Sequence, residues 1–241
     1  NKQKIMSPKT SIILCTYNEA NHIENAISEL EKYIPNLELV IVDDNSSDGT
    51  VEIIKRLNVS NKFKAIFRKK NRGLASAFVR GLIETTGDNI GWIDTNMGEV
   101  ATRFVEMAEE LKLNNDLVIL SRYIAGGGDK RNLIRVLCSK YFNILCRIIL
   151  TSSIKDFTSS IFLMKRQIIN EVTFLGYGHG EFFIEFLYKV HKMGFKIKEI
   201  PYVQKKDQDL TNSKSAPNLA KFFYLGFIYI LRIFSSIMRR D

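Results

Sequence analysis

Short apolar runs alternate with longer amphipathic stretches over the first 120 residues of the chain. The apolar runs predict buried strands, and the stretches with a helical period predict surface helices. The expected strands are 11–16, 38–43, 63–67, 89–94 and 117–121, and the expected helices between them are 20–33, 49–58, 73–86 and 101–113. Because strict alternation requires right-handed crossovers, we expect an α/β fold with a mostly parallel sheet that helices cover on both faces.

The pattern changes after Arg122. Three consecutive glycines lead into an amphipathic stretch, and a strand, a helix and another strand are expected beyond it. These segments are 126–128, 132–150, 160–164, 180–193 and 195–202. The polar run Gln204–Pro217 has no periodicity, which predicts a loop.

The last apolar block, Phe222–Met238, predicts a terminal helix. At 1.5 Å per residue it would span roughly 25 Å, a little less than a bilayer core of about 30 Å. Its aromatic residues, with Arg232 and the arginines at 239 and 240, suit a helix lying in the membrane–water boundary. A short transmembrane helix and a buried core helix are the alternatives. We therefore divide the chain into a domain at 1–216 and a membrane-associated helix at 217–241.

The 241 residues suit one domain of ordinary α/β size. Lysine and arginine number 35 against 26 aspartates and glutamates, which leaves a net charge of +9. Such a surplus suits an anionic partner, namely nucleic acid, acidic lipid head groups or phosphorylated substrates. We expect no nucleic-acid partner, because the chain contains no recognisable nucleic-acid module and no basic stripe interleaved with aromatics.

The three cysteines, Cys15, Cys138 and Cys146, have neither paired nor metal-ligand spacing. An odd and scattered set indicates reduced thiols, as in the cytoplasm. The first ten residues are polar and contain no signal-peptide core. The expected location is therefore cytoplasmic, peripheral to or anchored at the inner face of the cell membrane.

Polar residues follow three of the predicted strands. Thr16-Tyr17-Asn18-Glu19 follows the first strand, Asp43-Asp44 ends the second, and Asp94 ends the fourth. In an open α/β sheet, ligands bind at the carboxyl ends of the strands, where carboxylates can hold a ribose, a base or a divalent cation. The three strand ends predict one nucleotide-sized pocket. Ordinary turns and helix caps, for example Ser47 or Asp48 at the start of 49–58, are the alternative.

The same segments carry a resemblance to a known family. TSIILCTYNEANHIENAISEL, LELVIVDDNSSDGTVEII, NRGLASAFVRGL and IGWIDTNMGE are similar to successive blocks of family 2 glycosyltransferases with a GT-A fold. LSRYIAGGGDKRNLIRVLCSKYFNILCRIIL, IKDFTSSIFLMKR and a late NSK resemble the dolichyl- or polyprenyl-phosphate sugar synthase branch. The resemblance extends over roughly residues 10–216, and the order of the blocks makes it specific.

The resemblance implies a site for the nucleotide-sugar donor. Tyr17 would lie beside the base and Glu19 near the ribose, while Asp44 would accept hydrogen bonds from the nucleotide with the support of Asp43. Cys15 stands where the family usually has proline. The expected donor-binding residues are Thr16, Tyr17, Glu19, Val42, Asp43, Asp44 and Thr95.

Asp94-Thr95-Asn96 occupies the place of the family's Asp-x-Asp metal motif. The resemblance implies that Asp94 and Asn96 hold Mg²⁺ or Mn²⁺, which would neutralise charge on the leaving diphosphate. Asn96 offers an oxygen without a charge, so the metal affinity should be weaker than with two carboxylates. Gly98 stands where the branch often has glutamine, and Glu99 is a nearby acid. A surface turn is the alternative for Asn96 and Glu99.

Basic residues matching the synthase branch complete the expected catalytic set. The resemblance implies that Arg122 and Arg135 contact the diphosphate and the lipid phosphate, a role suited to the planar guanidinium. Lys214 would lie on a loop that closes over the donor, with Lys205 and Lys206 as weaker candidates. Solvated basic turns are the alternative. The expected catalytic residues are Asp94, Arg122, Arg135 and Lys214.

The predicted function is inverting transfer of a sugar from GDP-mannose or a UDP-sugar to a polyprenyl phosphate at the cytoplasmic membrane face. Transfer to a sugar hydroxyl is the first alternative and would need a general base, for which Glu181 is the candidate and Glu185 a structural neighbour. A non-catalytic protein that binds nucleotide-sugar is the second. His22, His179 and His191 are too dispersed for a metal site.

Overall fold

The computed structural model describes residues 8–206, apart from Asn71, Ser160, His179 and Glu181, together with Ile228, Ile230, Leu231 and Phe234 further along the chain. Those last four residues are helical. The rest of the expected membrane-associated helix at 217–241 lies outside the described residues. Within the described part of the chain, no helix has both the length and the apolar character needed to cross a membrane.

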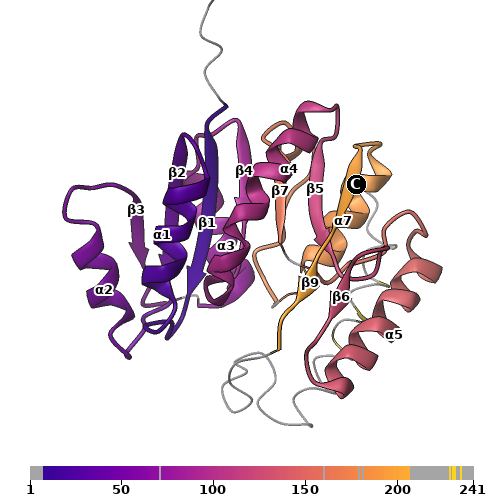
Figure 1. Ribbon diagram of the computed structural model, residues 1–241, viewed down its shortest axis with the longest axis horizontal. Helices are drawn as coiled ribbons and strands as arrows, with labels where there is room; N and C mark the ends of the chain where they lie inside the picture. The colour runs from indigo at the N-terminus through magenta and orange to yellow at the C-terminus, as the bar shows by residue number, and fades with distance from the viewer. Residues whose placement is uncertain are drawn as a thin grey trace, which may run out of the picture.

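A seven-stranded sheet runs through the molecule in the order β3-β2-β1-β4-β7-β5-β8 (Figure 1). Its strand β7 is antiparallel to β4 and β5, and the other neighbours are parallel. The strands are β1 Thr10–Thr16, β2 Leu37–Asp43, β3 Lys64–Phe67, β4 Asn89–Trp92, β5 Leu117–Ser121, β7 Phe162–Lys165 and β8 Ile197–Pro201. The prediction of a mostly parallel α/β sheet is confirmed.

Helices cover both faces of the sheet, as the alternation predicted (Figure 1). They are α1 Ile23–Tyr33, α2 Thr50–Leu57, α3 Leu74–Glu84, the 3-10 helix η1 Thr95–Thr102, α4 Arg103–Lys112, α5 Leu133–Ile149, α6 Ile168–Glu171 and α7 Phe182–Lys192. Strand β1 shows how the two cores arise. Ile12 and Leu14 pack in one apolar cluster and Ile13 packs in the other, because successive side chains of a strand point to opposite faces.

The cluster that contains Ile13 is rich in aromatic rings. Phe162 of β7 lies with its ring centroid 5.2 Å from that of Phe183 and 6.3 Å from that of Trp92. Phe78 of α3 lies 5.4 Å from Trp92. Offset and edge-to-face aromatic pairs add to the energy of apolar burial. Strand β7 is therefore held in the sheet by side chains from β4, α3 and α7.

A second, two-stranded sheet joins β6 (Gly128–Asp129) to β9 (Val203–Gln204) in parallel. The sequence pattern did not predict these strands. The chain turns back sharply after β5 to reach β6, and at Gly127 a Cβ atom would lie 2.6 Å from the backbone oxygen of Ser121. A side chain cannot occupy that space, so this turn requires glycine.

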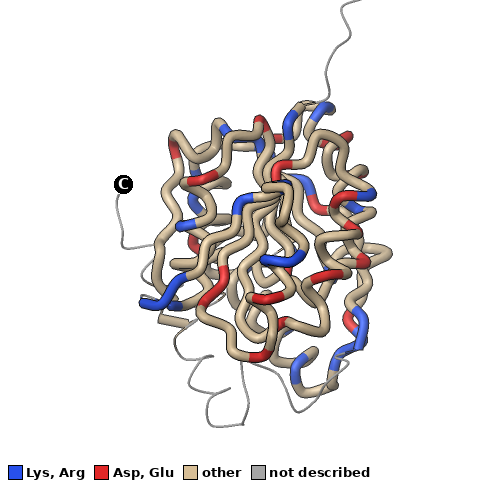
Figure 2. Tube along the Cα trace, turned by 90° about the vertical axis from the view of Figure 1, so that its left-hand side faces the viewer, with Lys and Arg blue, Asp and Glu red and all other residues tan. Residues whose placement is uncertain are grey.

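The net positive charge of the chain does not make its whole surface uniformly positive. On the side that carries α2 and β3, Lys and Arg segments are interspersed with Asp and Glu segments (Figure 2). Several of these charges form ion pairs across the surface, such as Arg56 with Glu24 at 2.6 Å. Surface pairs of this kind contribute little to stability, on the order of 0–1 kcal/mol each.

Candidate functional site

The three predicted strand ends lie side by side at one edge of the sheet. Strand β1 runs parallel to both of its neighbours, β2 and β4, and Thr16 at its end is in register with Asp43. The loops after these strands therefore leave from the same edge. Residues 16–19, 43–44 and 94–96 are brought together there, as the strand-end pattern indicated.

Side-chain hydrogen bonds join the loop after β1 to the loop after β2. The backbone N–H of Asn18 donates to Ser46 Oγ at 2.8 Å, and the N–H of Ser47 donates to Asn18 Oδ1 at 2.9 Å. Asp48 accepts the N–H groups of Ala20 and Thr50, at 3.0 and 3.1 Å. The polar run after Asp44 thus holds two loops in a fixed relation, in addition to opening α2.

Asp43 is fully buried and belongs to this framework. Its carboxylate accepts hydrogen bonds from Thr16 Oγ1 at 2.9 Å and from the backbone N–H of Ser46 at 2.9 Å. Thr16 is itself buried, and its hydroxyl is committed to Asp43. These two residues shape the pocket from beneath, which is the supporting role that the resemblance implied for Asp43.

Asp44 is 7% exposed, whereas its strand-end position led us to expect partial exposure. Arg68, which follows β3, donates from Nε to Asp44 Oδ1 at 2.7 Å, and the backbone N–H of Gly73 donates to Oδ2 at 2.7 Å. The end of a neighbouring strand thus covers Asp44. The expectation of partial exposure is wrong, because the partner of Asp44 comes from the end of β3, a strand end that we had not included in the site.

Tyr17 is the more exposed member of the expected donor site, at 44%. The guanidinium of Arg72 lies 5.5 Å from the centroid of its ring. Arg72 also donates to the backbone oxygen of Asp44 at 3.2 Å. An aromatic face beside a buried acid and an arginine is a surface on which a nucleotide base can stack.

Asp94 lies beyond the end of β4 and begins η1, since its backbone oxygen accepts the N–H of Met97 at 3.0 Å. Burial, together with the negative charge of Glu19, raises the pKa of Asp94 to about 6. Burial and the charges of Asp94 and Asp44 also raise the pKa of the Cys15 thiol. Negative charge accumulates at this edge of the sheet, which is the setting that favours a cation.

The residues after Asp94 divide into buried and exposed positions. Thr95 is buried, while Asn96 and Glu99 are exposed on η1. Gly98 faces α1, where a Cβ atom would lie 2.9 Å from Ala26 Cα. Glycine at this position therefore allows η1 to pack closely against α1, where the glutamine that the resemblance would place here could not fit without a shift.

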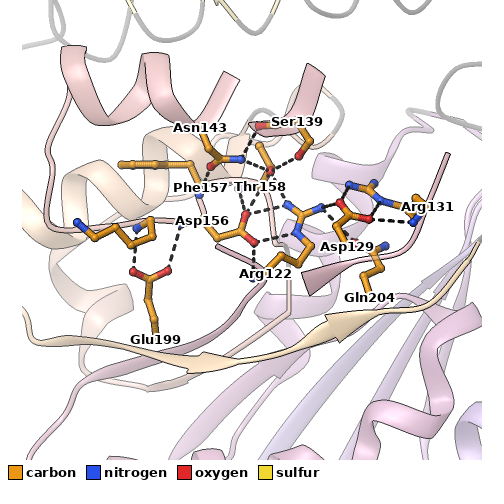
Figure 3. Close-up of polar contacts among 11 residues, drawn as sticks. Arg122, Asp129, Arg131, Ser139, Asn143, Asp156, Phe157, Thr158, Glu199 and Gln204 are labelled. Carbon is orange, nitrogen blue, oxygen red and sulfur yellow. Dashed lines mark hydrogen bonds and ion pairs between the residues drawn. The ribbon is translucent and has the colours of Figure 1, made fainter. Parts of the chain in front are cut away.

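Arg122 lies in a buried network with several acceptors (Figure 3). It forms two hydrogen bonds with Asp156, from Nε to Oδ2 at 2.8 Å and from Nη2 to Oδ1 at 2.7 Å. Nη2 also donates to Thr158 at 2.6 Å and Nη1 to Gln204 at 3.1 Å. Asp129 lies 3.6 Å from Nη1 and is bound in turn by Arg131.

This environment differs from the phosphate-binding one that we expected for Arg122. Nε and Nη2 donate all of their N–H groups to Asp156 and Thr158, and Nη1 donates one of its two to Gln204. A phosphate would therefore have to compete with these buried acceptors or bind the remaining N–H of Nη1, which lies 3.6 Å from Asp129. The geometry supports a positioning role in which Arg122 holds β6 and β9 against the end of β5. Its contact with a diphosphate remains a prediction.

The other predicted site residues are spread more widely. Arg135 is half-buried in the first turn of α5, and Val42 is fully buried, with its side chain packed beside Val40 and Ala77 rather than in the site. Lys205 forms an exposed ion pair with Glu99 at 3.5 Å. Lys214, Glu181 and His179 lie outside the described residues.

Glu185 and His191, also considered from the sequence, lie away from the strand-end site and have protein partners. Glu185 is buried on α7, 3.9 Å from Lys189 Nζ, and His191 bonds Thr151 at 3.0 Å. Among the residues that the structure describes, no three His, Cys, Asp or Glu side chains form a metal-binding group.

Two hollows lie at opposite edges of the sheet. One of ≈ 370 Å³ is lined by Gly73 beside Asp44, by Arg72 and Ser76, and by 176–178. The other, of ≈ 700 Å³, lies where β2 and β3 begin and is lined by none of the predicted site residues. The smaller hollow is thus the one that adjoins the strand-end site.

Sequence reasoning missed Arg68, Gly73, Asp129, Asp156 and Gln204. Arg68 carried a usable signal, because it directly follows a predicted strand. Asp156 carried only a weak one, since its partner Arg122 lies 34 positions earlier in the chain. Gln204 bonds to Arg122 through a strand pair of two residues, too short to leave a periodic pattern.

The chain is similar to several known proteins. The model of the family "Glycosyl transferase family 2" matches residues 11–173. A dolichol-phosphate mannosyltransferase from Pyrococcus furiosus is 33% identical over 169 residues, which are 68% of this chain and 48% of that protein. A polyprenol monophosphomannose synthase from Mycolicibacterium smegmatis is 25% identical over 204 residues, or 80% of this chain and 76% of that protein. The chain thus spans about half the length of the archaeal relative.

Solved structures share the fold. Glucosyl-3-phosphoglycerate synthase from Mycobacterium tuberculosis, in complex with Mn²⁺ and UDP-glucose, superposes with a TM-score of 0.71 at 18% identity, over 97% of this chain and 80% of that one. The same enzyme with UDP gives a TM-score of 0.70. The GT-A-like fold that the motifs predicted is confirmed. With the family model matched over most of its length, the chain belongs to glycosyl transferase family 2.

Proposed function

We propose that this protein transfers a sugar from a nucleoside-diphosphate sugar to a polyprenyl phosphate at the cytoplasmic face of a membrane. One observation carries the donor half of the proposal: Glu19, Asp44 and Asp94 lie together at the edge where the neighbouring strands β1, β2 and β4 end. The two relatives named as dolichol- and polyprenol-phosphate mannose enzymes support the acceptor half.

The donor would occupy the strand-end site. The base would stack on Tyr17 near Arg72, and the framework of Asp43, Thr16 and Ser46 would keep that loop in place. Asp44, held by Arg68, would set the position of Gly73 and Arg72 around the nucleotide. Because these groups are already fixed by one another, the site would bind the donor with little further ordering.

Mg²⁺ or Mn²⁺ suits the residues present. Two acids that repel one another at a partly buried site favour a cation, and Asp94 with the amide oxygen of Asn96 would supply oxygen ligands. When bound, the ion neutralises charge on the leaving diphosphate. Asp94 lies just beyond the end of β4, at the start of η1, so the sheet would fix the place of such an ion and of the diphosphate bound to it.

The acceptor phosphate is already an anion and needs no general base. One of its oxygens attacks the anomeric carbon, the bond from that carbon to the diphosphate oxygen breaks, and the nucleoside diphosphate leaves with the electron pair. Attack from the opposite side inverts the anomeric carbon. The protein would supply orientation and charge neutralisation, with Arg135 and Lys214 as the candidate cations for the two phosphates.

The test is to incubate the full chain with radiolabelled GDP-mannose and UDP-sugars, a polyprenyl phosphate, and either Mn²⁺ or EDTA. We expect labelled product that extracts into organic solvent and depends on the metal. A water-soluble labelled glycan that disappears in Glu181→Gln would instead indicate a hydroxyl acceptor. Thermal stabilisation by a nucleotide-sugar without turnover on any acceptor would indicate a non-catalytic binding protein.

A further inference from the structure

The outer face of α5 carries a continuous apolar stripe. Five of its members follow one another at spacings of four, four, three and four residues, which place them along one side of a helix. The exposed residues are between 42% and 77% accessible, and they are Leu133, Ile134, Leu137, Tyr141, Ile144 and Ile148. An exposed apolar surface of this length on one helix marks an interaction site.

The inner face of α5 already meets the needs of the fold. Phe142, Leu145, Cys146 and Ile149 pack against the apolar cluster around Phe162. Asn143 is buried and accepts the N–H of Phe157 at 2.6 Å. Among the residues that the structure describes, the outer stripe takes no part in this packing, and Figure 1 shows α5 at the margin of the molecule, beside β6.

The chain segment that contains the stripe is strongly basic. Between positions 130 and 155 the chain contains no aspartate or glutamate. Over the same span it has six cations, Lys130, Arg131, Arg135, Lys140, Arg147 and Lys155. This contrasts with the mixed charges on the side that carries α2 and β3 (Figure 2). One of these cations, Arg131, is paired with Asp129. A helix with an apolar outer face and a surplus of basic residues along it still matches the surface of an anionic bilayer.

We propose that the outer face of α5 docks in the plane of an anionic membrane surface, with its apolar stripe among the acyl chains and its cations at the head groups. The 17-residue helix is bound along one face by the domain, so it can lie on the membrane but not cross it. The inference rests on the membrane location in the proposed function and deepens it, because it names the surface of the protein that meets the bilayer, whatever sugar is transferred.

Docking through α5 would fix the rest of the site relative to the membrane. Asn143 Nδ2 donates to Thr158 Oγ1 at 2.9 Å, and Thr158 accepts from Arg122 at 2.6 Å. Helix α5 is thus connected through Thr158 to Arg122, the residue that holds β6 and β9. A lipid head group would meet the protein at this corner rather than at the α2 side.

A fluorescent reporter tests where the membrane contacts the protein. The chain has a single tryptophan, Trp92, which is 1% exposed, so a surface indole can be read against a constant background. With full-length Tyr141→Trp and vesicles of phosphatidylcholine and phosphatidylglycerol, we expect a blue shift and quenching by brominated lipid. Ile83→Trp, at a 72% exposed position on α3, is the control and should show neither change.

A pair of matched variants tests whether the stripe contributes to binding. Leu133→Asp/Ile148→Asp and Leu113→Asp/Ile83→Asp make the same change of residues and charge, at positions that are all 70–77% exposed. We expect the first to lower partitioning onto anionic vesicles by about tenfold or more, since it puts two charges among acyl chains. The second should change partitioning much less, and vesicles of phosphatidylcholine alone should bind both weakly.

Three outcomes would overturn the proposal. If the Tyr141→Trp variant sediments with the vesicles but its tryptophan emission does not change, the membrane contacts another part of the chain. Equal losses of partitioning in the two double variants would show a general effect of charge. A protein that sediments as a dimer in solution, and becomes a monomer only in Leu133→Asp/Ile148→Asp, would show that a second copy covers the stripe.

Discussion

Asp44 and Arg68 form a buried ion pair across the ends of β2 and β3, with Arg68 Nη2 2.6 Å from Asp44 Oδ1. Their side chains are only about one-tenth exposed, at 10% and 11%. The second carboxylate oxygen of Asp44 accepts the N–H of Gly73, at the start of α3. One acid therefore joins two strand ends and a helix beginning at the site where the donor is proposed to bind.

Asp44→Ala should affect both folding and donor binding. Removing one partner leaves the Arg68 charge buried, which costs roughly 3–5 kcal/mol of unfolding free energy. The affinity for UDP or GDP should fall by roughly 10-fold or more, because a binding interaction of about 1.4 kcal/mol corresponds to a tenfold change in affinity. Urea denaturation and titration calorimetry measure the two effects.

The double variant Asp44→Leu/Arg68→Met separates them. It removes both charges and should recover most of the unfolding free energy without restoring nucleotide affinity. Wild-type affinity in this folded variant would remove Asp44 from the donor site.

Asp94→Asn should change stability and metal-dependent binding in opposite directions. The raised pKa of Asp94 means that ionising this carboxyl lowers the stability of the folded protein, a cost that builds up as the pH rises from about 3.8 and is complete above about pH 6. Neutralising it should therefore stabilise the metal-free protein at pH 8 by about 1–2 kcal/mol, after allowance for solvent screening. Nucleotide binding in the presence of Mn²⁺ should weaken, because the principal protein ligand is lost. Thermal unfolding with and without Mn²⁺ and UDP measures both.

Asn96→Asp is the reverse test of the metal site. It adds the carboxylate that the family motif has, so the Mn²⁺ concentration for half-maximal activity should fall. The wild-type chain should be inactive in EDTA. Equal activity in EDTA and Mn²⁺ would contradict the metal role and leave charge neutralisation to Arg135 and Lys214.

Asp156→Ala should be one of the most destabilising single changes in the chain. It would leave Arg122 buried without its bidentate partner, at a cost of roughly 3–5 kcal/mol. Glu24→Ala is the control, because it breaks an ion pair of similar length, 2.6 Å, whose side chains are 63% and 58% exposed. That change should cost no more than about 1 kcal/mol. Similar losses in urea denaturation would show that the Arg122 network is not a structural anchor.

Stability should fall in acid through Glu38. Although its partial burial opposes the charged form, hydrogen bonds from Ser11, Thr86 and Lys9 lower the pKa of Glu38 to about 2. A carboxylate with a depressed folded pKa stabilises the protein above its unfolded pKa near 4.5, and this contribution is lost as the pH falls from there to about 2. We expect roughly 1–2 kcal/mol after allowance for solvent screening. The free energy of unfolding of Glu38→Gln should be lower at pH 7 and flatter from pH 5 to 2.5. A wild-type slope in that variant would assign the acid sensitivity elsewhere.

The parallel part of the fold could be predicted from the sequence because each of its strands is a local pattern followed by a helix. The antiparallel insertion of β7 could not, since Phe162–Lys165 is a short apolar run whose neighbours, β4 and β5, are distant in sequence. The pairing of β6 with β9 could not be predicted either, because a strand of two residues is too short to show an alternation of apolar and polar side chains.

The candidate site was predictable in position but not in its contacts. The strand-end rule brought Glu19, Asp43 and Asp94 to one edge correctly. It could not tell that Asp44 would be covered by Arg68, or that Arg122 would be enclosed by Asp156, because burial of a charge depends on partners from other strands. Local sequence gives the place of a polar residue, and tertiary contacts decide whether a ligand can reach it.

The place of β7 between β4 and β5 also sets an order of events during synthesis. Strands β1 to β4 are complete by Trp92, but the outer edge of β4 has no partner until Phe162–Lys165 has left the ribosome. For that interval the nascent chain exposes an unpaired, apolar strand edge, which is the feature most prone to pairing with other chains. Protection of this edge by a chaperone, or fast arrival of β7, would then govern the yield of folded protein more than the stability of the finished sheet does.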